Sequence, residues 1–290
     1  MKIYNLIRFD WAIKRLLRNK ANFVVLEGFL SELLKIDVKI IKILESEGNQ
    51  QSSEDKYNKV DLLAENNKGE IFIIEVQNQD EYDYFQRMTY GTSKVITEYL
   101  DKGQSYKELK KVYSVNIVYF DLGQGEDYVY HGITDFYGIH NKDKLKLSEK
   151  QKKEFGKTDP NELFPEYYIL KVNQFNDIAK DTLDQWIYYL KNDEIKDDFT
   201  AKGLEKAKEI LKVDKLDEDE KITYKKYLED LHYKASIIWS MQVDAKYKIR
   251  EEGKIEGMIE IAGKLLKKGM SIENIIDMTG LTEEQIKKLN

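Results

Sequence analysis

Two acidic side chains and one amide lie at related places on two apolar segments of the chain. Asp61 lies near the start of the segment 59–65, and Glu75 and Gln77 lie near the end of the segment 70–77. Carboxylate oxygens bind hard cations such as Mg²⁺, which keeps part of its water shell for chemistry. A cation held in this way activates water for hydrolysis. The residue types therefore predict metal-assisted hydrolysis.

A hairpin around Gly69 would bring these residues together. The loop 67–69 suits a type I turn followed by a left-handed glycine, and that register sets Asp61 opposite Glu75. Opposed residues share a face of the sheet, and Gln77 lies on the same face because side chains alternate along a strand. Two like charges among apolar neighbours need compensation, which a divalent cation supplies. On spacing alone, two alternatives stay open: the acids face solvent at a strand end, or they pair with Arg87 on the following helix.

The composition excludes several other kinds of chemistry. The 290 residues include no cysteine and three widely spaced histidines, which excludes disulfides, thiolate zinc sites and cysteine nucleophiles and disfavours a histidine metal site. The sequence contains no glycine-rich loop of the kind that binds phosphates, so it gives no indication of a nucleotide cofactor. The apolar runs are too short to cross a membrane, and the first residues lack a signal-peptide core. We therefore expect a cytoplasmic protein with no membrane partner.

The pattern of apolar residues predicts a mixed α/β core followed by helices. The order is helix, three strands, helix and strand, with the elements expected at 22–34, 38–44, 59–65, 70–77, 82–101 and 112–120. Two more strands and a helix are expected before residue 193. From about residue 194 only helices are expected. We divide the chain into a domain at 1–193, a helical region at 194–243 and a C-terminal part at 244–290.

The C-terminal part has the layout of a helix-turn-helix unit. Gly280 separates two short helices, and Thr282 and Gln285 form a capping box for the second one. Glu283 and Glu284 stand where a DNA-reading helix would carry Arg, Asn or Gln. This composition favours a hairpin that packs or dimerises over one that reads a DNA groove.

The first twenty residues are basic, although the whole chain has a net charge of −6. Lys14, Arg15 and Arg18 belong to this basic segment. One interpretation is that they hold the phosphates of an anionic polymer, with strongly salt-dependent affinity. The other is a solvated helix face.

The sequence Val60-Asp61 followed by Ile74-Glu75-Val76-Gln77, in this order of elements, resembles the PD-(D/E)xK nuclease superfamily. More narrowly, it resembles the Rpn family of recombination-promoting nucleases and transposase-like proteins. The segments 9–14, 87–90, 115–120 and 253–257 are also similar to that family, so the resemblance covers nearly the whole chain. It implies a restriction-endonuclease-like αβββαβ core with a mixed central sheet, followed by an all-helical C-terminal region.

The resemblance also implies roles for individual residues of the hairpin. Asp61 and Glu75 would bind Mg²⁺, or another divalent ion, together with the backbone carbonyl of Val76. Gln77 falls where the superfamily has a catalytic lysine; an amide orients water by hydrogen bonding but adds no charge, so we expect a lower rate. Val60 replaces the proline of the motif.

Three residues on helices complete the expected site. Glu27, from the helix before the sheet, is our choice for a third catalytic acid; the alternative is that it bonds a lysine such as Lys59. Arg87 and Tyr90 lie one turn apart and would contact the scissile phosphate, unless they only pack their helix onto the sheet.

The implied function is a Mg²⁺-dependent DNA endonuclease of low sequence specificity, from a family linked to recombination and transposition. The alternative is a nucleic-acid-binding or assembly module on the same fold whose catalysis has decayed. DNA is the expected partner, and a homodimer through the C-terminal helices is a further expectation.

Overall fold

The computed structural model describes residues 6–44, 60–100 and 103–289. Contacts between Cα atoms divide the chain into two compact units, Met1–Glu218 and Asp219–Asn290. The division expected from composition, at residues 193/194 and 243/244, stays a prediction. In the structure, the first unit extends beyond residue 193. It includes the helix α6 (Leu204–Ile210) and the buried side chains of Leu204 and Leu211.

A six-stranded mixed sheet forms the centre of the first unit, in the order β1-β2-β3-β4-β6-β5. The antiparallel pairs are β1–β2, β2–β3 and β5–β6, and β3, β4 and β6 run parallel. Their bounds are β1 (Ile40–Leu44), β2 (Leu62–Asn66), β3 (Ile71–Gln77), β4 (Val112–Val118), β5 (Val129–Gly132) and β6 (Glu166–Lys171). The mixed sheet and the order of helix, three strands, helix and strand confirm the predicted fold class.

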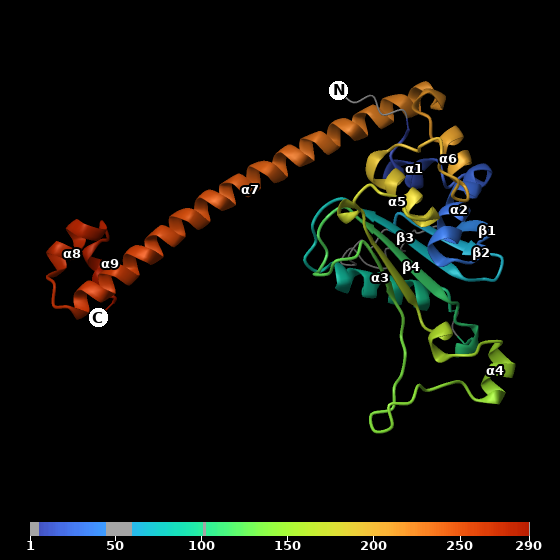
Figure 1. Ribbon diagram of the computed structural model, residues 1–290, viewed down its shortest axis with the longest axis horizontal. Helices are drawn as coiled ribbons and strands as arrows, with labels where there is room; N and C mark the ends of the chain where they lie inside the picture. Colours follow the sequence, from blue (N-terminus) through green and yellow to red (C-terminus); the bar gives the residue numbers. More distant parts are fainter. Residues whose placement is uncertain (1–5, 45–59, 101–102, 290) are drawn as a thin grey trace. The chain divides into compact units, whose positions relative to one another are not determined.

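Helices cover both faces of this sheet (Figure 1). One face carries α1, α2, α5 and α6, and the other carries α3. The segment between β5 and β6 extends away from the sheet and contains α4. The helices span α1 (Phe9–Arg15), α2 (Phe23–Leu34), α3 (Tyr84–Glu98), α4 (Glu149–Phe155), α5 (Thr182–Asn192) and α6 (Leu204–Ile210).

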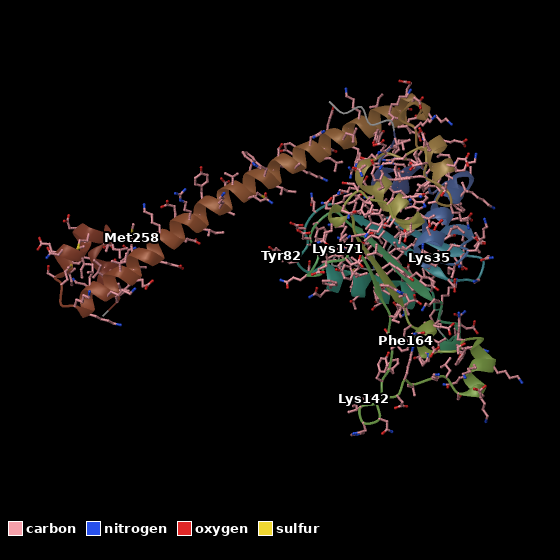
Figure 2. The ribbon with its side chains drawn as sticks, viewed as in Figure 1. Lys35, Tyr82, Lys142, Phe164, Lys171 and Met258 are labelled. Carbon is pink, nitrogen blue, oxygen red and sulfur yellow. The ribbon has the colours of Figure 1, made fainter. Side chains whose placement is uncertain are left out.

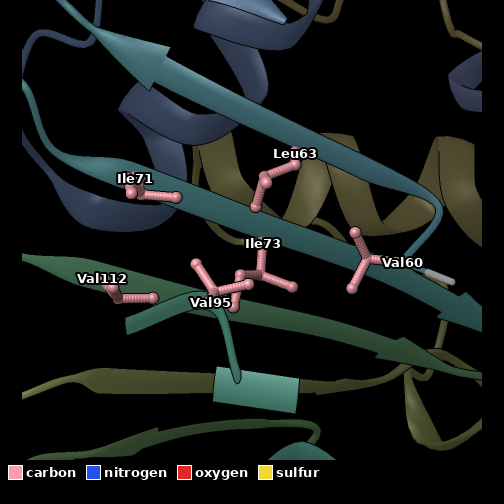
Figure 3. Close-up of a cluster of buried hydrophobic side chains, with 6 residues drawn as sticks. All are labelled: Val60, Leu63, Ile71, Ile73, Val95 and Val112. Carbon is pink, nitrogen blue, oxygen red and sulfur yellow. The ribbon is translucent and has the colours of Figure 1, made fainter. Parts of the chain in front are cut away.

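Each face of the sheet has its own apolar packing. On the side of α1, α2 and α5, the rings of Phe9, Phe29 and Trp186 are in contact, with centroids 5.5 to 6.5 Å apart. On the opposite side, Val95 of α3 packs over a cluster from the strands (Figure 3). The members of that cluster are Val60, Leu63, Ile71, Ile73, Val95 and Val112. Because side chains alternate along a strand, Glu75, two positions after Ile73 on β3, belongs to the face that α3 covers.

The hairpin has the register that the sequence predicts. Leu62 pairs with Ile74 across β2 and β3, so the same register continued by one residue sets Asp61 opposite Glu75. Gly69 closes the turn with φ of 77°, and its N–H donates to the carbonyl of Asn66. The left-handed glycine is favourable here because a side chain at positive φ is strained.

A close approach of two backbones joins α2 to α6. A Cβ added at Gly28 would lie 2.6 Å from the Cα of Gly203 and closer still to the carbonyl oxygen of Lys202. We therefore expect Gly28→Ala to lower the free energy of unfolding by about 2 kcal/mol, because the helices must separate. Urea denaturation followed by tryptophan fluorescence measures the change, since Trp186 donates its indole N–H to Lys202.

Gly253→Ala is the matched control for this prediction. Gly253 lies within the helix α7 (Glu218–Lys267), and a Cβ there would meet no other atom within 4 Å. The change should stabilise that helix by up to about 1 kcal/mol, because alanine has the higher helix propensity. Equal effects of the two substitutions would contradict the close approach at Gly28.

The second unit consists of α7, α8 (Ile272–Thr279) and α9 (Glu283–Lys287). Met258 of α7, labelled in Figure 2, packs against a core of Ala262, Ile275, Leu281 and Ile286. The predicted glycine turn and capping box are present: Gly280 has φ of 68°, and Thr282 and Gln285 bond each other. The helix expected at 224–241 is much longer than predicted. None of the described helices combines the length and apolar character that a membrane span needs.

Candidate functional site

Asp61 is held by groups from two different elements. Its Oδ2 accepts the backbone N–H of Val76 at 2.8 Å, which ties the aspartate to β3. Its Oδ1 forms an ion pair with Lys14 Nζ at 3.0 Å. Its main-chain carbonyl accepts Nη2 of Arg18 at 2.8 Å. The end of α1 and the segment that follows it therefore fix both the side chain and the backbone of Asp61.

Glu75 is a buried acid with incomplete charge compensation. The residue is 7% exposed, and its Oε2 lies 3.3 Å from Nη2 of Arg87 on α3. Burial raises the pKa of Glu75 to about 7; Arg87 opposes the rise, and the charge of Asp61 adds to it. The two acids are therefore electrostatically coupled, and removing protons from both has an energetic cost.

Glu81 is a third acid at this site, and the sequence analysis missed it. Gln77 donates its amide N–H to Glu81 Oε1 at 2.6 Å, and Arg87 Nη1 donates to the same oxygen at 2.7 Å. Burial lowers the pKa of Arg87, but Glu75 and Glu81 outweigh it and raise that pKa above its usual range. The Nε of Arg87 is buried without a hydrogen-bond partner. The signal for Glu81 was its position four residues after Gln77, on the loop that leads into α3.

Glu27 lies elsewhere in the structure. Its Oε1 accepts the backbone N–H of Ile40 at 2.9 Å, and its Oε2 pairs with Lys39 at 3.2 Å. Among the contacts of the described residues, none joins Glu27 to Asp61 or Glu75. The observed bonds give Glu27 a structural role, because they attach α2 to the edge strand β1. Lys59, the partner proposed for it as an alternative, lies outside the described residues.

The remaining predicted residues differ in how closely they approach the acids. Lys14, Arg18 and Arg87 contact the two acids, as described above. Arg15 is exposed, and Tyr90 is exposed on α3. Within the described part of the chain, neither of these two side chains has a contact with Asp61 or Glu75. The structure thus brings together part of the expected phosphate-binding set.

A second polar network fixes the end of β3 beside the site. Asn78, which directly follows Gln77, donates its amide to Asp10 Oδ2 at 2.9 Å and accepts from Arg8 at 3.4 Å. Arg8 also contacts Asp10 at 3.3 Å and Asp193 at 3.5 Å. Burial raises the pKa of Asp193 to about 7, and Asp10 adds to the rise. This network joins α1, β3 and the end of α5, so it holds Gln77 in place.

The donor atoms suit a hard divalent ion with several bound waters. Asp61 and Glu75 supply carboxylate oxygens, and Val76, whose main-chain carbonyl is the third expected ligand, directly follows Glu75 on β3. Among the described residues, no cluster of three or more acidic, histidine or cysteine side chains could hold a metal. Mg²⁺ is commonly bound by one or two carboxylates and keeps the rest of its waters. The residues present therefore fit Mg²⁺ better than an ion that needs a full set of side-chain ligands.

Family models match both parts of the chain. Residues 7–240 match the model of the PD-(D/E)XK nuclease family transposase, and residues 256–290 match the Rpn/YhgA-like nuclease family, C-terminal HTH domain. Comparisons with curated proteins and with solved structures gave no significant match. The first match covers far more than half of the chain and includes the hairpin with Asp61, Glu75 and Gln77. The chain therefore belongs to the family of PD-(D/E)XK nuclease family transposases, and it ends in the HTH domain of the Rpn/YhgA-like nucleases.

Proposed function

We propose that the protein is a Mg²⁺-dependent DNA endonuclease of low sequence specificity that acts in recombination or transposition. Membership of a nuclease family supports a nuclease-like function. The observation that carries the proposal further is the coupling of Asp61 to Glu75, whose pKa burial raises to about 7. Arg87 compensates the charge of Glu75 only in part, and perturbed acids of this kind are typical of functional sites.

The residues of the site would divide the work of hydrolysis among them. Asp61, Glu75 and the carbonyl of Val76 would hold Mg²⁺. When bound, the ion supplies Lewis-acid chemistry: it polarises the phosphoryl group and lowers the pKa of water. Gln77 orients the attacking water by hydrogen bonding. Its amide already bonds Glu81, so the loop after β3 limits the directions in which Gln77 can point.

The reaction itself is a substitution at phosphorus. The oxygen of a water molecule forms a bond to phosphorus, and the bond from phosphorus to one sugar oxygen breaks. The water gives up a proton, and the departing sugar oxygen takes one up. Negative charge grows on the phosphoryl oxygens during the attack, so cations near the acids accelerate it.

The C-terminal HTH domain supports DNA as the substrate. Its own surface gives weaker support for groove reading, because Lys287 and Lys288 of the last turn pair with Glu283 and Glu284 at 2.6 and 3.1 Å. We propose that this unit binds DNA without reading a long sequence, or that it joins two chains. A homodimer would supply two sites for the two strands.

The test is a plasmid assay on the purified full-length chain. Supercoiled DNA incubated with the protein should be nicked in Mg²⁺, and a chelator should stop the reaction. Plasmids of unrelated sequence should be cut at similar rates. Absence of nicking in every divalent ion tested would favour the second candidate, a module that keeps the fold without catalysis. The neutral Gln77 in place of a lysine is the observation that favours that candidate.

A further inference from the structure

The site lacks a lysine where the reaction needs a positive charge. Gln77 occupies the position of the superfamily's lysine, and its amide N–H donates to Glu81 at 2.6 Å. An amide has no net charge, so Gln77 cannot offset the charge that grows on the phosphoryl oxygens. Another group of the chain must supply that charge if hydrolysis is to be fast.

Among the residues that the structure describes, three cations contact the two acids, and two of them are committed to other bonds. Arg87 contacts both Glu75 and Glu81, at 3.3 and 2.7 Å. Arg18 donates to the main-chain carbonyl of Asp61, where its role is to hold the backbone. These arginines cannot turn toward a substrate without breaking the bonds that shape the site.

Lys14 is the third cation, and it has the freedom that the arginines lack. Its ammonium lies 3.0 Å from Asp61 Oδ1, and its side chain is 51% exposed. Solvent around the lysine end of this ion pair screens the attraction, so the pair contributes little to stability. A lysine stem is flexible and carries three donors, so its ammonium can move a few ångströms at small cost. The fold places the Lys14 ammonium beside Asp61, but the stability of the fold depends little on this ion pair.

We propose that Lys14 is a catalytic residue that supplies the positive charge missing at Gln77. This inference rests on the nuclease function proposed above. The ammonium pairs with Asp61 Oδ1, and it would be free to leave that oxygen if Asp61 held a divalent ion. It then donates hydrogen bonds to a phosphoryl oxygen of the DNA. Lys14 forms no covalent bond and is neither oxidised nor reduced. Water adds to phosphorus and gives up a proton, the bond from phosphorus to the sugar oxygen breaks, and the departing oxygen takes up a proton.

This role differs from the one expected from the sequence, which was a grip on flanking phosphates. A flanking grip contributes to DNA affinity and to its salt dependence. A charge at the reacting phosphate contributes to the rate of the bound complex. Lys68 offers a matched control, because it is an exposed lysine in the turn of the same hairpin and, within the described part of the chain, has no contact with either acid.

The experiment compares the wild-type chain with Lys14→Met, Lys14→Arg and Lys68→Met in three measurements. Calorimetry gives the affinity for Mg²⁺ alone. Titration of a DNA duplex in Ca²⁺, at several salt concentrations, gives DNA affinity. Single-turnover nicking with protein in excess gives the rate of the bound complex. Circular dichroism verifies that each variant is folded.

For Lys14→Met we expect nicking about 100-fold slower, the scale for loss of one transition-state donor. Its Mg²⁺ affinity should be equal or up to about tenfold tighter, because a competing charge next to Asp61 is gone. Lys14→Arg should recover part of the rate. Lys68→Met should nick within about threefold of the wild type and keep the salt dependence of DNA binding, because it removes one exposed charge at the other end of the hairpin.

Four results would overturn the proposal. Loss of Mg²⁺ binding in Lys14→Met would make the lysine a structural residue. An unchanged single-turnover rate with weaker DNA binding would make it a flanking phosphate grip. A wild-type chain that binds Mg²⁺ but cuts no DNA would refute the nuclease function, and the catalytic role of Lys14 with it. A wild type that cuts, with Lys14→Met cutting equally fast, would refute the role of Lys14 alone.

Discussion

Asp61→Asn and Glu75→Gln should each reduce plasmid nicking on the order of 1000-fold, equivalent to about 4 kcal/mol of transition-state stabilisation. Both changes keep the shape of the side chain and remove one charged oxygen donor. Asp61 Oδ2 accepts a hydrogen bond from Val76, and an amide oxygen at that position would keep the bond. The variants should therefore fold, and the loss should come from the missing charge.

Glu65→Gln is the control for these two variants. Glu65 is also a buried acid of the same hairpin, 7% exposed, on β2. It pairs with Lys42 and Lys110 at the other end of the strand, at 3.1 and 2.9 Å. Its neutralisation should leave nicking within a few fold of the wild type. Equal losses in all three variants would mean that any buried charge of the hairpin matters, and the site would lose its specific role.

Arg87→Met should lower the free energy of unfolding of the metal-free protein by about 3 kcal/mol at pH 8, since it leaves a buried acid without its partner. Arg87 contacts Glu75 and Glu81, and it opposes the burial that raises the pKa of Glu75 to about 7. Without the arginine, that pKa rises further. The loss of stability is the cost of ionising Glu75 in the folded state.

The sign of the pH dependence follows from the raised pKa. A carboxyl whose pKa is higher in the folded than in the unfolded protein stabilises the fold at low pH, and this stabilisation is lost as the pH rises. For Glu75 the window runs from the ordinary value of 4.5 to about 7 in the wild type, and further upward in Arg87→Met. Arg87→Met should therefore lower the free energy of unfolding less at pH 5 than at pH 8.

Urea denaturation in the presence of a chelator, at both pH values, measures this effect. Adding Glu75→Gln to Arg87→Met should remove most of the pH-dependent part, because the titrating group is gone. Glu81 would remain without its arginine, but it lies nearer the surface than Glu75. A cost that is the same at both pH values and in both backgrounds would show that Arg87 only packs against the sheet.

The hairpin could be predicted because the residues that determine its turn and its strand register are close together in the sequence. The turn at Gly69, the alternation along β2 and β3 and the register of Leu62 with Ile74 follow from neighbouring residues. The same reasoning set Asp61 opposite Glu75 and placed Arg87 within reach. A strand register has few solutions once one face must be buried, so a short segment specifies it.

The contacts made by α1 and α2 were not predictable in the same way. Lys14 meets Asp61 across 47 positions of sequence, and only the packing of α1 against the sheet brings them together. Glu27 was expected to face the site because its helix has an apolar stripe, but a stripe does not say which strand lies opposite each residue. The backbone N–H of Ile40 at the sheet edge was the partner.

The length of α7 was also missed, and for a different reason. The helix runs through Gly253, Gly257 and Gly263, which have low helix propensity, and its apolar residues do not form one continuous stripe. Lysine and glutamate, which are good helix formers, occupy many of the remaining positions. Propensity summed over the whole segment outweighs the three glycines.

The central claim is that Asp61 and Glu75 together hold a divalent ion. Calorimetric titration of Mg²⁺ into the metal-free wild type, Asp61→Asn, Glu75→Gln and Glu65→Gln tests it without reference to DNA. The account predicts saturable binding by the wild type and Glu65→Gln, and affinity at least about tenfold weaker in the other two variants. Binding of equal strength in all four proteins, or no binding in the wild type, would contradict it.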